Sequence, residues 1–233
     1  PGRKGKELGR FGEGSETRLP GGLRAWVGLA KDPFFGNSPG LHVFRGQLAQ
    51  GKYDPQVWEK ASGKNIFQGR TCASLVLEVP NQSLGKQIKV FSTSGVQMGG
   101  QWQQEQYMAR PLVAHTMLFE DDVLKTAYDR SRPDTQGQFQ NFFAARIARS
   151  AHFARSQSDV FAYGDQTAKG LLPDVIPYQV GSEATFSAAR VNGRKLGDDA
   201  MSATLTLLIG QPTDQHLKDS RYYTDKFPFV VLA

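Results

Sequence analysis

Three aspartates stand where a site for a hard cation or for hydrolysis could form. Asp32 precedes a proline at the end of a predicted strand, and Asp198 and Asp199 are adjacent in a loop ahead of a second predicted strand. Loop carboxylates are the ligands that Ca²⁺ takes in proteins, although the spacing here matches no EF-hand. Together with a histidine they predict a hydrolase or a metal-dependent enzyme. The alternative is that each carboxylate accepts backbone hydrogen bonds in a turn or at a helix start.

The other residues of catalytic type are scattered along the chain. His42, His115, His152 and His216 lie far apart, and none belongs to an HExxH pair. The serines of "STSG" and "GSEA", Ser94 and Ser182, lack the flanking glycines of a G-x-S-x-G elbow, and no glycine-rich loop has the lysine and hydroxyl of a phosphate loop. The single cysteine, Cys72, lies inside a predicted strand. This pattern predicts no cofactor and favours a protein that is not an enzyme.

Basic residues in two segments are candidates for binding a partner. One segment is the amino-terminal stretch 1–22, and the other is a predicted helix that also carries phenylalanines. The candidate residues are Arg3, Lys4, Lys6, Arg10, Arg146, Arg149 and Arg155. Arginine and aromatic side chains are enriched at protein interfaces. The default interpretation of the helix is a solvated basic face, and the functional interpretation is a docking face for an acidic protein surface or phospholipid head groups.

The overall charge narrows the class of partner. A net charge of +6 permits contact with nucleic acid, but the basic residues are spread along all 233 positions and no recognition motif accompanies them. We therefore expect a protein partner or a larger assembly, membrane-associated or not, rather than nucleic acid. The chain has no apolar run of about 18 residues, the length that a membrane-spanning helix needs.

The elements that would position these residues are mostly predicted strands. The segments "LRAWVGLA", "CASLVLEV" and "KQIKVFSTS" have strand composition, and the last two predict an antiparallel pair. A helical period runs from about 111 to 155, with Phe139, Phe143 and Ile147 four residues apart. In "MSATLTLLIG" the alternation of Leu205, Leu207 and Ile209 predicts another strand.

These elements predict an α+β protein that is mainly β, with an antiparallel β-sandwich-like core and a helical insertion at about 111–155. Residues 23–233 form its single domain. Residues 1–22 hold seven glycines and few large apolar side chains, which predicts an extended basic arm held by a neighbouring surface. Phe34 and Phe35 follow the first strand, and we expect one of them to anchor the core.

Five segments, in order, resemble the bacterial family of unknown function DUF4331 over roughly residues 23–210. They are "RAWVGLAKDPFF", "SLVLEVPNQSLGKQIKVFSTS", "MARPLVAHTMLF", "LLPDVIPYQV" and "NGRKLGDDAMSATLTLLIG". The family's usual opening segment has no counterpart here. The resemblance implies a β-rich fold and an extracytoplasmic location, periplasmic or secreted, but no activity.

The sequence therefore predicts a non-enzymatic, extracytoplasmic binding or assembly module that attaches to a larger protein complex. The alternative is a hydrolase or metal-dependent enzyme built on the carboxylates and a histidine. Convergence of these side chains in one cleft would favour the enzyme.

Overall fold

The computed structural model describes residues 12, 14–60 and 63–233. Its helices are η1 (Pro20–Gly22), α1 (Ser38–Ala49), α2 (Val57–Lys60), η2 (Asn81–Ser83), α3 (Val113–Met117), α4 (Asp122–Asp129), η3 (Gln136–Phe139), α5 (Gln140–Ala154), α6 (Val160–Leu171) and α7 (Ala200–Ile209). Its strands are β1 (Ser15–Leu19), β2 (Leu23–Lys31), β3 (Thr71–Glu78), β4 (Gln87–Val90), β5 (Ser92–Met98), β6 (Gln101–Met108), β7 (Ile176–Gln179), β8 (Thr185–Phe186) and β9 (Val191–Asn192).

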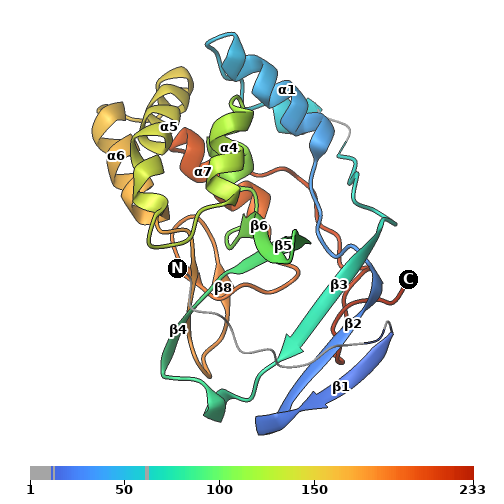
Figure 1. The fold of residues 1–233 in the computed structure, drawn as a ribbon. Helices are drawn as coiled ribbons and strands as arrows, with labels where there is room; N and C mark the ends of the chain where they lie inside the picture. The colour runs from blue at the N-terminus through green and yellow to red at the C-terminus, as the bar shows by residue number, and fades with distance from the viewer. Residues whose placement is uncertain (1–11, 13, 61–62) are drawn as a thin grey trace.

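The strands form small separate sheets rather than two facing layers. A three-stranded sheet has the order β1-β2-β3, and three two-stranded sheets pair β4 with β7, β5 with β6 and β8 with β9, all antiparallel. Figure 1 shows the three-stranded sheet at one end of the molecule and the longer helices gathered at the other. The structure has 34% helix and 25% strand, so the expected mainly-β sandwich is wrong.

The main hydrophobic core lies among the helices. Buried side chains on α1, α5 and α7 meet there, including Phe44, Phe143, Ile147 and Leu205, each no more than 1% exposed. The helix α7 is buried on most of its circumference, because its apolar residues point in nearly every direction. The largest apolar side chains are buried among the helices. The sheets therefore do not face one another as they would in a sandwich.

The segment "MSATLTLLIG" is this buried helix, not the expected strand. A helix that is apolar all round can show the same short-range alternation as a strand, so periodicity alone does not separate the two. Asp199 accepts a hydrogen bond from the Ser202 amide (2.9 Å) at its start, and Gly210 ends it with φ of 72°. These capping residues were the sequence signal for a helix.

Two further expectations about the elements are corrected by the structure. Helices are not confined to an insertion at 111–155, because α1, α6 and α7 lie outside it. The predicted antiparallel pairing of "CASLVLEV" with "KQIKVFSTS" is also wrong, since β3 pairs with β2 and β4 pairs with β7. Both strands of that expected pair exist, but each finds a partner far away in the sequence.

Part of the predicted arm belongs to the body. Residues 15–19 form β1, which pairs with β2 from Ser15↔Val27 to Leu19↔Leu23. The tight connection uses Gly21 and Gly22, which have φ of 82° and 78°, a region that favours glycine. The expected attachment residues Arg3, Lys4, Lys6 and Arg10 lie outside the described residues.

The helix pair α5 and α6 packs closely because α6 carries a glycine at the contact. A Cβ added at Gly164 would lie 2.5 Å from the carbonyl oxygen of Ala144 and 3.0 Å from the Cβ of Ala148. The backbone oxygen cannot move aside without displacing α5. A side chain at this position therefore forces the two helices apart.

We expect Gly164→Ala to lower the free energy of unfolding by about 1–3 kcal/mol, the usual cost of overpacking. Gly170→Ala is the matched control in the same helix, because nothing lies within 4 Å of its added Cβ. That control should raise stability by about 0.5 kcal/mol, since alanine is the better helix former. Urea denaturation of the two variants measures both effects, and equal midpoints would contradict the close packing.

Candidate functional site

The sheet β1-β2-β3 has one face that is apolar and open. On β2 and β3 the register places Leu29 beside Ala73, and Val27 beside Leu75. The side chains of Leu29, Leu75 and Leu77 share this face and are 48%, 68% and 47% exposed. Large apolar side chains gathered in this way mark interaction sites on protein surfaces. We call the face formed by these three leucines the leucine face.

The opposite face of the sheet is covered. Trp26 is 5% exposed, and the guanidinium of Arg24 donates to the carboxylate of Glu78 at 3.0 and 2.6 Å. The same guanidinium lies 4.2 Å from the ring centroid of Phe227, which belongs to the carboxyl-terminal segment. The two faces therefore differ: one is packed within the molecule, and the leucine face is exposed.

The edge of β3 is also available. Within the described part of the chain, β3 pairs with β2 alone. On the far side of β2, the Lys31 amide and the Leu29 carbonyl bond to residues 231–233 at 2.8 and 3.1 Å. Since hydrogen-bonding directions alternate along a strand, the even-numbered residues of β2 are the ones that bond to β3.

This alternation decides which backbone groups of β3 are unpaired. Gly28 lies opposite Ser74 and Trp26 lies opposite Val76, so the even-numbered residues of β3 face β2. The amides and carbonyls of Ala73, Leu75 and Leu77 therefore point away from the sheet. The exposed leucines and the outward backbone groups belong to the same residues.

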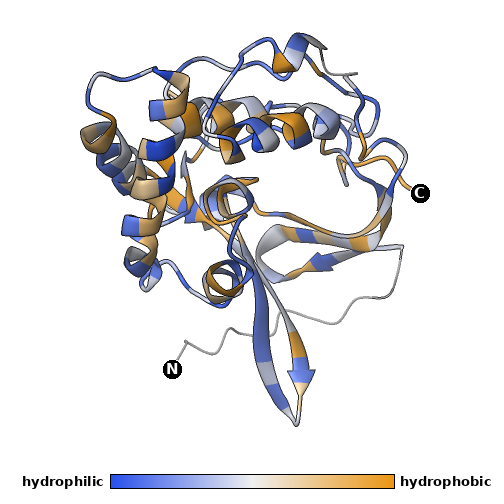
Figure 2. Ribbon diagram, turned by 90° about the horizontal axis from the view of Figure 1, so that it is seen from above, coloured by the Kyte–Doolittle hydropathy of each residue, from blue (hydrophilic) through white to orange (hydrophobic). Residues whose placement is uncertain are grey.

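A second exposed apolar feature is the hairpin of β5 and β6. Figure 2 shows it projecting from the body, and Val96, Met98 and Trp102 near its tip are 46%, 59% and 75% exposed. The pairs Met98↔Gln101 and Gln97↔Trp102 put the methionine and the tryptophan on opposite faces of the ribbon. The hairpin thus lacks a continuous apolar face like that of the three-stranded sheet.

Each of the three candidate metal-binding carboxylates accepts a hydrogen bond from a backbone amide. Asp32 accepts the Phe34 amide at 2.9 Å, and Asp198 accepts the Lys195 amide at 2.6 Å. Asp199 caps α7 and accepts the side-chain amide of Gln215 at 2.6 Å. Across residues 12, 14–60 and 63–233, no three His, Cys, Asp or Glu side chains come together as a metal site would require. Among the described residues, the carboxylates of the enzyme hypothesis thus do not belong to a group that could hold a metal ion.

The arginines of α5 have different environments. Arg146 is 7% exposed at its side chain, donates to Glu120 at 3.0 Å and lies 4.3 Å from the centroid of the Phe119 ring. Burial lowers the pKa of its guanidinium. Arg149 is half-exposed and also pairs with Glu120, at 3.3 Å. Arg155 is exposed at the end of α5. Arg146 serves packing, and Arg149 and Arg155 remain at the surface.

The two phenylalanines after the first strand differ in burial. Phe35 is 4% exposed, whereas Phe34 is half-buried with its ring edge-on to Phe67, 4.9 Å between centroids. Phe35 is therefore the core anchor of this pair.

The sequence reasoning missed a buried polar cluster around Asp174. The Asp174 carboxylate is 2% exposed and accepts the Tyr128 hydroxyl (2.9 Å) and the Arg110 amide (3.1 Å). Its own amide donates to Gln136 (2.8 Å), and its carbonyl accepts the Tyr107 hydroxyl. Burial raises the pKa of Asp174 to about 6, and it also raises the pKa of both tyrosines.

Comparisons with protein-family models, with curated proteins and with solved structures found no match. The resemblance to DUF4331 thus stays a prediction. Among the helices in the part of the chain that the structure describes, none is both long and apolar enough to span a membrane.

Asp174 should make the protein less stable as the pH rises. Its pKa is about 6 in the folded state and about 3.9 when unfolded, so the native state holds the extra proton between these values. Stability should fall between about pH 4 and 6, by at most about 3 kcal/mol. Asp174→Asn keeps an acceptor for the Tyr128 hydroxyl but cannot titrate.

Denaturation midpoints of the wild type and Asp174→Asn, measured at several pH values, test this. The difference between the two proteins cancels the contributions of the other carboxylates. It should shift in favour of the variant as the pH rises from 4 to 6 and then level off. A constant difference would show that Asp174 ionises normally.

Proposed function

We propose that this protein is a non-catalytic binding module that attaches to a larger assembly by accepting a strand from a protein partner on the edge of β3. One observation carries the proposal: the outward backbone groups of β3 and its exposed leucines belong to the same residues, Leu75 and Leu77. An added strand gains main-chain hydrogen bonds and covers apolar surface in a single step. An exposed apolar edge strand without such a partner is an aggregation hazard.

The leucine face also sets the chemistry of the partner strand. Neighbouring strands place their side chains on shared faces, so every second residue of the partner must be apolar to extend the leucine face. The intervening residues lie beside Ser74, Val76 and Glu78, and we expect those beside Ser74 and Glu78 to be polar. The partner is therefore an amphipathic strand with apolar and polar residues in alternation.

Two further points support a binding role. Asp32, Asp198 and Asp199, which the enzyme hypothesis required, are hydrogen-bonded to backbone amides instead of forming a cluster. The resemblance to DUF4331 adds an extracytoplasmic location to the proposal. The exposed Arg149 and Arg155 remain candidates for secondary contacts with an acidic surface of the partner.

Leu75→Pro removes one outward N–H donor and should abolish attachment without unfolding the protein. Proline is tolerated on an edge strand where its missing N–H would have faced solvent. Val76→Pro is the matched control for the hydrogen-bonding directions, because the Val76 amide faces β2. We expect Val76→Pro to lower the melting temperature markedly and Leu75→Pro to lower it little.

Attachment itself is measured by purifying the tagged chain from its native source. Wild type and Phe161→Glu, which changes an exposed residue on α6, should recover the same amount of one partner protein. Leu75→Pro and Leu77→Glu should recover at least about tenfold less of it. Hydrogen exchange of the recovered complex should show protection at residues 73, 75 and 77. Equal recovery by Leu75→Pro, or protection confined to other segments, would exclude strand addition on β3.

A further inference from the structure

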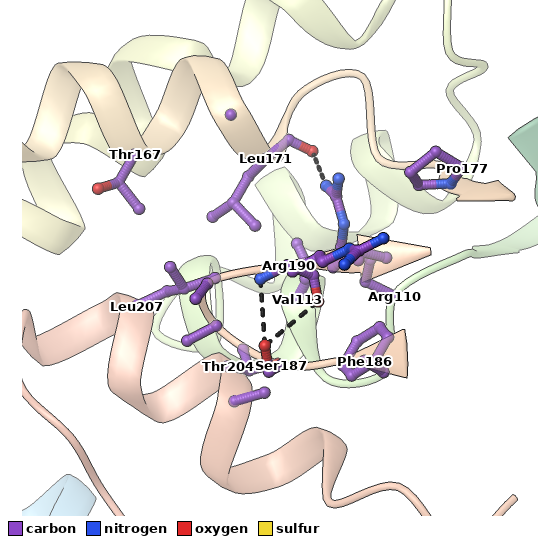
Figure 3. A pocket seen from close by; sticks show the side chains of 15 residues that line it. Arg110, Val113, Thr167, Leu171, Pro177, Phe186, Ser187, Arg190, Thr204 and Leu207 are labelled. Carbon is purple, nitrogen blue, oxygen red and sulfur yellow. Dashed lines mark hydrogen bonds between the residues drawn. The ribbon is translucent and has the colours of Figure 1, made fainter. Parts of the chain in front are cut away.

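A cavity far in sequence from the leucine face lies between the helical core and the hairpin of β8 and β9. It has a volume of about 290 Å³ and is lined by residues of α6 and α7, by Arg110, and by the hairpin residues 186–191. Figure 3 shows Arg110 and Arg190 on one side of it, with Thr167 and Leu207 across from them. At about 30 Å³ per water, it has room for a ligand of roughly ten non-hydrogen atoms.

The walls are mostly apolar. Val113, Leu171, Phe186, Val191 and Leu207 line the cavity from four different segments. Val113 and Leu171 are buried and form its floor, while Gly170, Ala189 and Arg190 are exposed and mark its mouth. Ligand pockets typically combine such apolar walls with a small number of fixed polar groups.

Arg110 supplies a fixed cation at the cavity. Its Nη1 donates to the carbonyl of Leu171 at 2.7 Å and lies 3.9 Å from Oδ1 of Asp174. Its Nε is buried without a hydrogen-bond partner. Two contacts therefore hold the guanidinium in place while part of its donor capacity stays unused.

Arg190 supplies a second cation from the hairpin. Its backbone is fixed by two hydrogen bonds, in which Arg190 N donates to the Ser187 hydroxyl (3.1 Å) and Ser187 N donates to the Arg190 carbonyl (2.8 Å). Its side chain is exposed and makes no ion pair within the described part of the chain. The cavity thus has a rigid arginine inside and an adjustable arginine at its mouth.

We propose that this cavity binds a small monocarboxylate with an apolar body, its carboxylate held by Arg110 and Arg190. Arginine is suited to carboxylates because its planar donors match the two oxygens. The Asp174 carboxyl beside Arg110 disfavours a second negative charge on the ligand, which argues against a phosphate dianion. The site is separate from strand addition on β3, so either proposal can hold without the other.

The test titrates the full chain with octanoate, octanol and inorganic phosphate by calorimetry. Octanoate should bind with one-to-one stoichiometry and at least about tenfold more tightly than octanol or phosphate, since only it offers both a carboxylate and an apolar body. Arg190→Gln should weaken octanoate binding at least about tenfold. Arg190 is exposed, so this variant leaves the buried Asp174 cluster intact.

Two more variants keep the test decisive. Ala203→Leu, which adds volume to the α7 wall of the cavity, should abolish octanoate binding. Arg18→Gln removes an exposed arginine of β1 and should leave it unchanged. The proposal is overturned if octanoate fails to bind, if octanol or phosphate binds as tightly, if Arg190→Gln binds like wild type, or if Arg18→Gln loses binding equally.

Discussion

The buried carboxyl of Asp174 is the constraint on which most of the arrangement depends. A carboxyl group can leave water only if the protein replaces its hydrogen bonds. Here the replacements come from α4 through Tyr128 and from the segment that precedes α3 through the Arg110 amide. The backbone of Asp174 adds contacts to Tyr107 on β6 and to Gln136 on η3. One residue thereby connects the stretch 107–110, α4 and η3, each at least 38 residues away from it in the sequence.

The same constraint shapes the cavity. Arg110 lies between Asp174 and the Leu171 carbonyl, so the residue that pairs with the buried acid also lines the cavity. Burial lowers the pKa of this guanidinium, while the neighbouring carboxyl opposes that change. The charge at the cavity is therefore a consequence of how the core is held together.

The position of the hydrophobic core among the helices explains why the leucine face is exposed. Helices α1, α5 and α7 bury their apolar side chains against one another, and no second sheet covers β1-β2-β3 within the described residues. The leucine face stays exposed because the helices pack against one another and not against this side of the sheet. Its alternating leucines have the pattern of a strand with one buried face, and a partner strand would complete the burial that the molecule itself does not provide.

The sequence by itself determined the local character of the chain. The strand propensity of "LRAWVGLA" and "CASLVLEV" and the four-residue spacing of Phe139, Phe143 and Ile147 led to β2, β3 and α5, because these signals depend only on neighbouring residues. Only the tertiary structure decided what each element packs against. The alternation in "MSATLTLLIG" did not reveal a buried helix, since a segment rich in apolar residues fits either period until its surroundings are known. Leu75 and Leu77 alternate along a strand and are exposed, while Arg146, a candidate for binding a partner, is buried. Asp174 gave no local signal at all, because its partners lie between 38 and 67 residues away and burial is a property of the assembled fold.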